Sequence, residues 1–288
     1  MNYRNTALPP GLHLISTPIG NARDITLRAL DTLASADVLA AEDTRMLLKL
    51  MHIHGVPLDG RRVLAFHDHS RPADRAKLVE AMVRGQSVAY ATDAGTPLIA
   101  DPGFTLVAEA RKAGVPVTAA PGASALTMAL SVAGLPTDRF SFRGFAPSAR
   151  AARRGFLAGL AQAEETSVFY ETPRRIADCL TDAAEILGPA REAVLCRELT
   201  KRFEEVRSGT LQGLADLVAE TGPKGEMVVL LAPSERPEAA AEDVDAAIRE
   251  ALITMRVKDA AEVVAGSFGL PRRDVYQRAL RLKSGEGS

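Results

Sequence analysis

Two loops rich in small residues are the parts of this chain best suited to holding a ligand through the backbone. The first spans residues 92–103 (Thr-Asp-Ala-Gly-Thr-Pro-Leu-Ile-Ala-Asp-Pro-Gly) and follows an apolar, β-favouring run at 88–92. The second, Pro-Gly-Ala-Ser-Ala at 121–125, follows the next such run at 115–119. Glycine and small side chains let a ligand approach backbone amides and carbonyls closely. Two such loops at the ends of neighbouring strands therefore predict a nucleotide-sized cleft.

Charged side chains gather at other expected strand ends. The segment 42–45, Glu-Asp-Thr-Arg, is either a capped helix start with a salt-bridged arginine or a substrate-facing group. Glu171 and Arg174 either pair with each other at a helix start or serve the function. Glu198 and Lys201 leave the same two interpretations open, solvated charge or functional group.

Basic residues are concentrated in two stretches. Residues 139–163 contain no acid, and this stretch is either a solvated helix face or a patch that contacts phosphates; its arginines are Arg139, Arg143, Arg150, Arg153 and Arg154. Residues 271–283 contain five basic residues against one acid, Asp274. These five are Arg272, Arg273, Arg278, Arg281 and Lys283. The net charge of the chain is −1, so any attraction to nucleic acid must come from such local patches.

Alternating strands and helices must position these groups. Strands are expected at 12–16, 38–41, 62–66, 88–92 and 115–119, with helices between them, and Asp24 is expected to cap the first helix. This half predicts a mainly parallel, covered sheet. After a break at 134–138, a second α/β unit is expected with strands at 139–145, 167–171, 193–197, 205–209 and 227–231. A Pro/Ala/Glu-rich linker at 233–242 leads to helices at 244–252, 257–268 and 271–282, a small helix-turn-helix-like appendage. The expected domains are thus 11–134, 135–233 and 241–284.

Composition and missing motifs exclude several classes of protein. With 47% apolar and 25% charged residues, the chain is globular. It has neither an apolar run of the roughly 18 residues that a membrane span needs nor a secretory signal. Its two cysteines lack a CxxC pattern, which fits the cytoplasm. Walker, GxGxxG and G-x-S-x-G motifs do not occur. His67 and His69 lack a nearby third His or Cys, so we expect no metal site.

Several motifs together resemble one enzyme family. They are Ser-Thr-Pro-Ile-Gly-Asn at 16–21, Ala-Glu-Asp-Thr-Arg at 41–45, the two small-residue loops, Phe-Tyr-Glu-Thr-Pro-Arg-Arg at 169–175, Cys-Arg-Glu-Leu-Thr-Lys at 196–201 and Gly-Glu-Met-Val at 225–228. Over residues 11–282 the chain resembles the tetrapyrrole-methylase-like, S-adenosylmethionine-dependent methyltransferases. Within them it resembles the ribosomal RNA small subunit methyltransferase I family, which methylates a cytidine 2′-O-ribose of 16S rRNA.

The resemblance implies an α/β fold of two tetrapyrrole-methylase-type domains with a helical appendage. It implies S-adenosyl-L-methionine as cofactor, 16S rRNA in the small ribosomal subunit as partner, a homodimer, a cytoplasmic location and no membrane. The implied cofactor contacts are Asp93, Gly95, Pro97, Leu98, Ser124, Ala125, Tyr170, Leu199 and Met227. The candidates for a catalytic base are Asp43, Glu171, Glu198 and Lys201. The expected RNA contacts are Arg45, Arg143, Arg150, Arg153, Arg154, Arg174, Arg272 and Arg273.

Two alternatives remain open from the sequence. A tetrapyrrole or diphthamide-pathway methyltransferase shares the fold, but its substrate would require neither the helical tail nor the acid-free arginine stretch. A non-catalytic ribosome-associated binding protein would not need intact small-residue loops at both cofactor edges.

Overall fold

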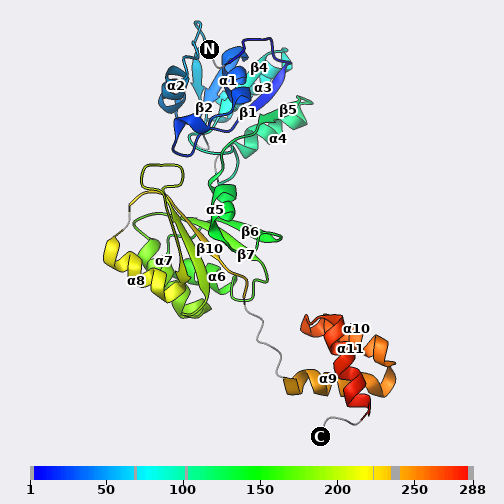
Figure 1. Ribbon diagram of the computed structural model, residues 1–288. Coiled ribbons are helices and arrows are strands. Elements are labelled where there is room, and N and C mark those ends of the chain that lie inside the picture. Colours follow the sequence, from blue (N-terminus) through cyan, green and yellow to red (C-terminus); the bar gives the residue numbers. More distant parts are fainter. Residues whose placement is uncertain (1–2, 68–69, 101–102, 223, 235–240, 285–288) are drawn as a thin grey trace. The chain divides into compact units, whose positions relative to one another are not determined.

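The chain divides into two compact units, residues 1–233 and 234–288, each described here by itself (Figure 1). The computed structural model describes residues 3–67, 70–100, 103–222, 224–234 and 241–284, without the side chains of 241 and 242. In this part of the chain no helix is both long enough and apolar enough to span a bilayer.

The first sheet of unit 1 has the order β3-β2-β4-β1-β5, and every pairing in it is parallel. Its strands are β1 (Gly11–Ile15), β2 (Val38–Ala41), β3 (Val63–Ala65), β4 (Ser87–Ala91) and β5 (Val117–Ala120). They are connected through a 3₁₀ turn η1 (Ala22–Asp24) and the helices α1 (Leu27–Ser35), α2 (Thr44–Ile53), α3 (Pro72–Val83) and α4 (Phe104–Lys112). Because all five strands run the same way, their carboxyl ends meet at one edge.

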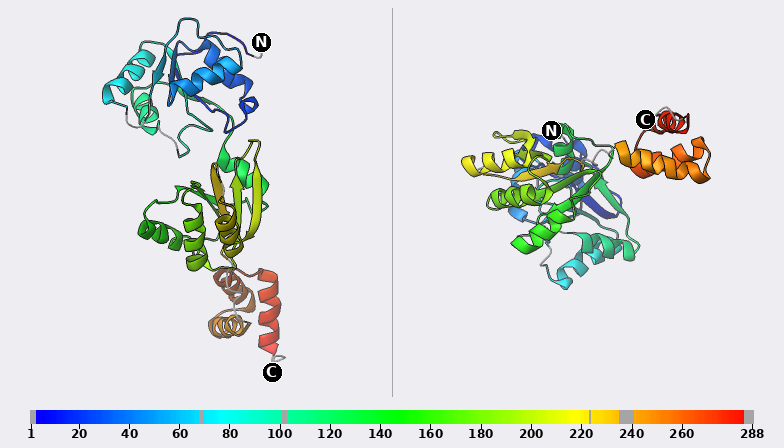
Figure 2. Two further views of the ribbon diagram at one scale, coloured as in Figure 1. Left: turned by 90° about the vertical axis from the view of Figure 1, so that its left-hand side faces the viewer. Right: turned by 90° about the horizontal axis from the view of Figure 1, so that it is seen from below.

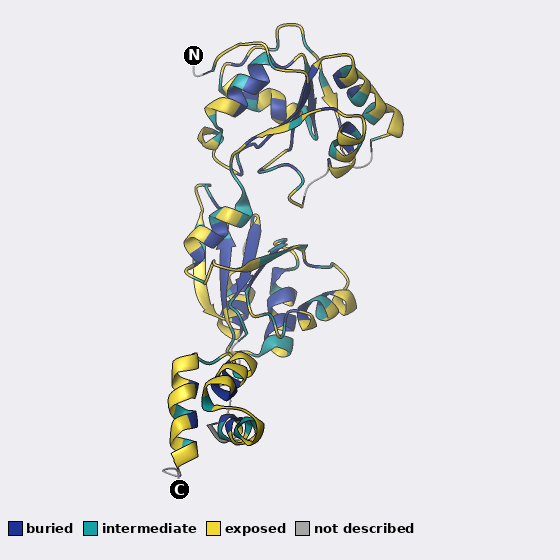
Figure 3. Cartoon of the chain, turned by 90° about the vertical axis from the view of Figure 1, so that its right-hand side faces the viewer, coloured by how far each residue is buried: buried dark blue, intermediate teal, exposed yellow. Residues whose placement is uncertain are grey.

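Helices cover both faces of this sheet, and successive side chains of each strand point alternately to one face and the other. In β4, Ala89 and Ala91 pack with α1 and α2, whereas Val88 and Tyr90 pack with α3 and α4. Such two-sided burial explains why the strand is apolar without interruption. Figure 3 shows buried residues on the strands and on the inward sides of the helices.

The second sheet of unit 1 has the order β6-β7-β10-β8-β9; β6 and β7 are parallel and the other pairings antiparallel. Its strands are β6 (Phe140–Phe145), β7 (Thr166–Glu171), β8 (Glu192–Arg197), β9 (Glu205–Thr210) and β10 (Met227–Leu231). One face packs on α6 (Arg150–Ala158), α7 (Ile176–Leu187) and α8 (Leu211–Thr221), and the other on α5 (Ala125–Ala133). Thus α5, which directly follows the first sheet in the chain, covers the second.

Unit 2 consists of α9 (Ala241–Thr254), α10 (Val257–Phe268) and α11 (Arg272–Ser284), which lie against one another in all views (Figures 1 and 2). Its small core contains Val244, Ile248, Val264 and Val275. Gly269, with a positive φ of 64°, ends α10. The turn to α11 is therefore short, as the Gly-Leu-Pro sequence predicts.

The structure confirms the expected α/β class, the parallel first sheet and the helical appendage, and it corrects local details. The first helix is capped by Thr26, whose Oγ1 accepts from the amide of Ala29 at 3.2 Å, because Asp24 is used in the preceding 3₁₀ turn. The fifth strand begins at Val117 and not at Val115. The two small-residue loops do not follow neighbouring strands, because β1 lies between β4 and β5 in the sheet.

Candidate functional site

A cavity of about 590 Å³ opens where the carboxyl edge of the first sheet meets the second sheet. The first sheet contributes the loops after β1, β4 and β5. The second contributes the end of β7, the turn after β8 and the start of β10. Met227 is paired with Glu171 in one ladder and with Arg197 in the other, so these three positions share one edge of the sheet.

The loop after β4 is fastened to the loop after β1. Thr17 and Gly95 exchange two backbone hydrogen bonds, of 2.9 and 3.0 Å, and the Thr17 hydroxyl donates to the Thr92 carbonyl at 3.1 Å. Gly95 has a φ of +82°, which side-chain-bearing residues rarely adopt. The loop can therefore place bare backbone at the cavity wall.

The second sheet adds a buried carboxylate. Glu171 ends β7 with only 2% of its surface exposed. Its Oε1 accepts from the Thr172 amide at 2.9 Å and pairs with Arg175 Nε at 2.6 Å. Its Oε2 is buried and has no hydrogen-bond partner among the residues that the structure describes. Because an unmatched buried acceptor is costly, this oxygen at the cavity wall is suited to a ligand's hydroxyl or ammonium donor.

Glu198 and Lys201 form an ion pair on the wall. Lys201 Nζ donates to Glu198 Oε1 at 2.8 Å and to Glu226 Oε2 at 3.1 Å, and the Glu226 amide donates to Glu198 Oε1 at 3.0 Å. Burial raises the pKa of Glu198, but the bonds from Lys201 and the Glu226 amide outweigh it and hold that pKa below its usual range. Burial lowers the pKa of Lys201, but the two carboxylates outweigh it and raise that pKa. Lys201 is thus an ammonium at neutral pH.

Backbone strain is concentrated around this cavity. Leu98, Ala100, Glu198 and Thr200 adopt positive φ angles of 71°, 60°, 52° and 65°. Each costs of the order of 1–3 kcal/mol and persists only where neighbouring contacts enforce it. At Gly225, a Cβ would collide with the Glu198 side chain. Glycine at this position therefore leaves room for the Glu198 side chain.

A second cavity of about 330 Å³ adjoins the first. It is bounded by the loops after β1 and β4 and by one side of α2. Both cavities are lined by Ile19, Ala94, Lys201 and Glu226, which therefore form a shared wall.

The structure brings together most of the expected cofactor residues. Gly95, Ser124, Ala125, Tyr170, Leu199 and Met227 line the larger cavity. Asp93 lines the smaller one, and its Oδ1 accepts from the amide of Asp43 at 2.8 Å. Pro97 and Leu98 are among the described residues that line neither cavity, and Leu98 packs instead against the core of the first sheet.

Three of the four candidates for a catalytic base line the larger cavity. Glu171, Glu198 and Lys201 line the larger cavity, whereas Asp43 lines neither. Asp43 caps α2 by accepting from the Arg45 amide, and its carboxylate pairs with the Arg45 side chain at 2.6 Å. The hydrogen bond from the Arg45 side chain lowers the pKa of Asp43 to about 2. The structure thus shows the expected capped and salt-bridged helix start, with Arg45 itself exposed.

Of the two interpretations of Glu171 and Arg174, the one that pairs them with each other is wrong in its partner. Glu171 pairs with Arg175, one residue further on, while Arg174 is exposed.

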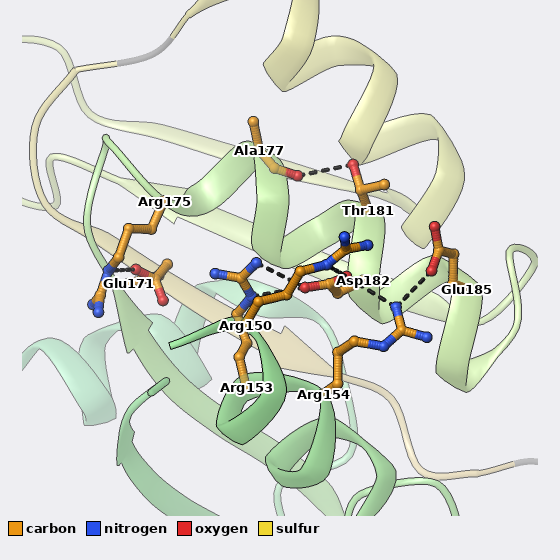
Figure 4. A network of polar contacts seen from close by, with 9 residues as sticks. All are labelled: Arg150, Arg153, Arg154, Glu171, Arg175, Ala177, Thr181, Asp182 and Glu185. Carbon is orange, nitrogen blue, oxygen red and sulfur yellow. Dashed lines mark hydrogen bonds and ion pairs between the residues drawn. The ribbon is translucent and has the colours of Figure 1, made fainter. Parts of the chain in front are cut away.

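Three of the five arginines in the acid-free stretch, all on α6, surround a carboxylate from another helix (Figure 4). Asp182 of α7 is 2% exposed and pairs with Arg153 at 2.7 Å, Arg154 at 3.0 Å and Arg150 at 3.3 Å. Arg153 itself is only 4% exposed, so for this residue both sequence interpretations, solvated face and phosphate contact, are overturned. Arg150 and Arg154 keep exposed surface beside Asp182.

The remaining expected RNA contacts lie at the surface. Arg45, Arg143 and Arg174 are exposed in unit 1, and Arg272 and Arg273 in unit 2. Of the basic residues in α11, Arg272 pairs with Glu262 and Arg278 with Asp245.

Some cavity residues are not evident from the sequence. Glu226 bonds to Lys201 and lines both cavities, and Phe145, on the edge strand β6, lies against Tyr170 with ring centroids 5.4 Å apart. Glu226 falls inside the 225–228 motif, where only Met227 was singled out. Phe145 carries no motif, because its place depends on the pairing of β6 with β7. Of the histidine pair, His67 is described and His69 lies outside the described residues, as do Asp101 and Pro102 of the 92–103 loop.

Comparison with known proteins identifies two matching families. Residues 11–215 match the family described as tetrapyrrole (corrin/porphyrin) methylases, and residues 238–283 match the RsmI C-terminal HTH domain. The ribosomal RNA small subunit methyltransferase I of Mesorhizobium japonicum is 45% identical, with 97% of this chain and 95% of that protein covered. The protein of the same name from Vibrio cholerae is 42% identical, with 96% and 97% covered.

Solved structures share the fold of unit 1. A cobalt precorrin-4 methyltransferase superposes with a TM-score of 0.59 at 18% identity, covering 78% of this chain and 96% of that one. A diphthine synthase superposes with a TM-score of 0.57 at 18% identity, covering 77% and 89%. At this identity the likeness concerns the fold alone.

Proposed function

Because the chain belongs to the tetrapyrrole (corrin/porphyrin) methylase family and, within it, to the ribosomal RNA small subunit methyltransferase I proteins, we propose that it methylates the 2′-hydroxyl of a cytidine ribose in 16S rRNA. The methyl donor is S-adenosylmethionine. The similarity to rRNA methyltransferases along almost the whole chain, including the helical appendage, is the observation that carries this proposal.

The larger cavity fits such a donor. Bare backbone around Gly95 and the small residues Ser124 and Ala125 suit a purine and ribose, and Tyr170, Leu199 and Met227 offer an apolar surface. The unpartnered Oε2 of Glu171 accepts from a ribose hydroxyl or from the ammonium of the methionine moiety. Leu98 supports the loop by packing against the core of the first sheet, Pro97 is buried beside it, and Asp93 acts at the smaller cavity.

S-adenosylmethionine supplies an electrophilic methyl group on a sulfonium, so the chain has to align donor and acceptor and exclude water. Alignment at about 3 Å can by itself lower the barrier by several kcal/mol. A base would assist a ribose hydroxyl, which is a poor nucleophile at neutral pH. Of the four candidates for this base, Lys201 is protonated and the carboxylate of Asp43 is paired with Arg45, so neither is suited to accept the proton. Glu198 holds Lys201 in place, so we assign these two residues to orienting the groups at the shared wall.

Exposed arginines would hold the RNA backbone. In unit 1 these are Arg45, Arg143, Arg150 and Arg174, together with the half-buried Arg154, and in unit 2 Arg272 and Arg273. Phosphate contacts of this kind give a marked dependence on salt. A porphyrinoid substrate would need neither this set nor the appendage, which favours RNA. We place the enzyme in the cytoplasm with the small ribosomal subunit and propose that it acts as a homodimer.

The test is transfer of tritium from methyl-labelled S-adenosylmethionine to purified small ribosomal subunits by the full chain. We expect label in the RNA and a rate that falls as salt is raised. Binding of S-adenosylmethionine by calorimetry without any label in the RNA would contradict the RNA substrate. Absence of binding would contradict the methyl donor as well.

A further inference from the structure

The smaller cavity has one apolar side and one polar side. Its α2 side is apolar, because Met46, Leu50 and Ile53 follow one another at spacings of four and three residues and so share one side of the helix. Met46 and Ile53 are 49% and 52% exposed, so the two ends of this apolar strip are open to a ligand.

The loop side of the same cavity is polar. Thr17 and Thr92 contribute hydroxyls and Asp93 a carboxylate, and Lys49 adds a positive charge from α2. An apolar platform facing carboxylate and hydroxyl groups is the combination that single nucleobases require, since they stack through their faces and hydrogen-bond through their edges. A carboxylate is also the group that accepts from the exocyclic amine of cytosine.

The position of the cavity relative to the larger one restricts what it can hold. Lys201 and Glu226 lie on the wall common to both cavities, with Nζ and Oε2 3.1 Å apart. A methyl acceptor has to come within about 3 Å of the donor, so its pocket must adjoin the donor's. The smaller cavity adjoins the larger across this wall.

We propose that the smaller cavity is the subsite for the acceptor nucleoside, taken out of the RNA stack and laid on the α2 platform of Met46, Leu50 and Ile53. The proposal rests on the proposed function, because it takes the larger cavity as the donor site. In this arrangement Asp93 reads the base edge, Lys49 attracts the flanking phosphate, and the ribose meets the shared wall. A base extruded into a pocket next to the reacting group is how enzymes reach atoms that a stacked base would shield.

Kinetics with a matched control test the platform. The double variant M46A/I53A should lose about tenfold or more in kcat/KM for small ribosomal subunits, while its affinity for S-adenosylmethionine stays within twofold of the unsubstituted chain. The control is Leu48→Ala, on the same helix and 39% exposed, but not among the described residues that line the cavity. Unchanged kcat/KM in the double variant, or an equal loss in the control, would overturn the proposal. So would a loss of S-adenosylmethionine affinity, which would assign the platform to the donor.

A binding measurement that needs no turnover separates this proposal from the proposed function. Cytidine 5′-monophosphate is titrated into the full chain carrying isotope-labelled methionine methyl groups. We expect the Met46 signal to shift, whereas that of Met255, 42% exposed in unit 2, should not. A missing Met46 shift overturns the subsite even if subunits are methylated. A Met46 shift with no methyl transfer to subunits leaves the subsite in place and refutes the RNA substrate.

Discussion

Replacing Asp182 by asparagine removes one charge from a buried cluster without changing the size of the side chain. Asp182 accepts from Arg153 Nε at 2.9 Å and from Arg154 Nη1 at 3.0 Å. In the variant the asparagine amide group is a donor, and any amide hydrogen that faces the guanidinium groups meets other donors. Arg153, 4% exposed, would then be a buried cation without its counter-ion.

The cost follows from burial. Removing one partner of a buried ion pair destabilises a protein by about 3–5 kcal/mol, whereas an exposed pair contributes about 0–1 kcal/mol. Glu185→Gln is the matched control, because Glu185 is 50% exposed and meets the same Arg154. We expect D182N to lose about 3–5 kcal/mol of unfolding free energy and Glu185→Gln less than about 1 kcal/mol.

Urea unfolding followed by circular dichroism measures both, and the pH dependence gives a second signature. Burial raises the pKa of Asp182, but the three arginines outweigh it and hold that pKa below its usual range. A carboxylate with a lowered pKa stabilises the fold at pH above its unfolded value of about 4, and this contribution is lost as pH falls through the folded pKa. The gap between D182N and the unsubstituted chain should therefore narrow in acid. A loss below about 1 kcal/mol at neutral pH, or a gap that does not change in acid, would refute the reasoning.

Three further predictions concern binding and assembly. Gly95→Val should weaken S-adenosylmethionine binding at least tenfold by calorimetry. The control is Gly188→Val, which also has a positive φ, of 99°, but open space around the Cβ, and it should not weaken binding. Equal affinities of the two variants would contradict the role of Gly95. Deleting residues 241–288 should leave S-adenosylmethionine binding largely intact and abolish methylation of small subunits; methylation retained at unchanged salt sensitivity would remove the appendage from RNA binding. Light scattering at micromolar concentration should give the mass of a homodimer, and a monomer mass would rule it out.

Local patterns in the sequence were sufficient to predict the strands, the parallel sheet and the small-residue loops. The motifs indicated the family that the comparisons confirm. These features depend on neighbours along the chain. Gly95 and Ser124 at the cavity follow directly from two strands whose carboxyl ends must share an edge. The cap of the first helix is Thr26 and not Asp24, because Asp24 belongs to the 3₁₀ turn that precedes this helix.

Partners far apart in the sequence were the part that could not be predicted. The arginines of α6 pair with Asp182, which follows some 30 residues later. The absence of acids near these arginines in the sequence therefore did not reveal the buried ion pair. Glu226 bonds to Lys201 only because β10 lies between β7 and β8. The positive φ angles of Glu198 and Thr200 are imposed by packing at the cavity and have no signal in residue type.

The identity of the methylated nucleoside tests the account most directly. Small ribosomal subunits that lack the modification are incubated with the full chain and isotope-labelled S-adenosylmethionine, and the RNA is digested to nucleosides for mass spectrometry. We predict labelled 2′-O-methylcytidine as the product. Label on a base, on another nucleoside or on no RNA nucleoside at all would contradict the proposed function.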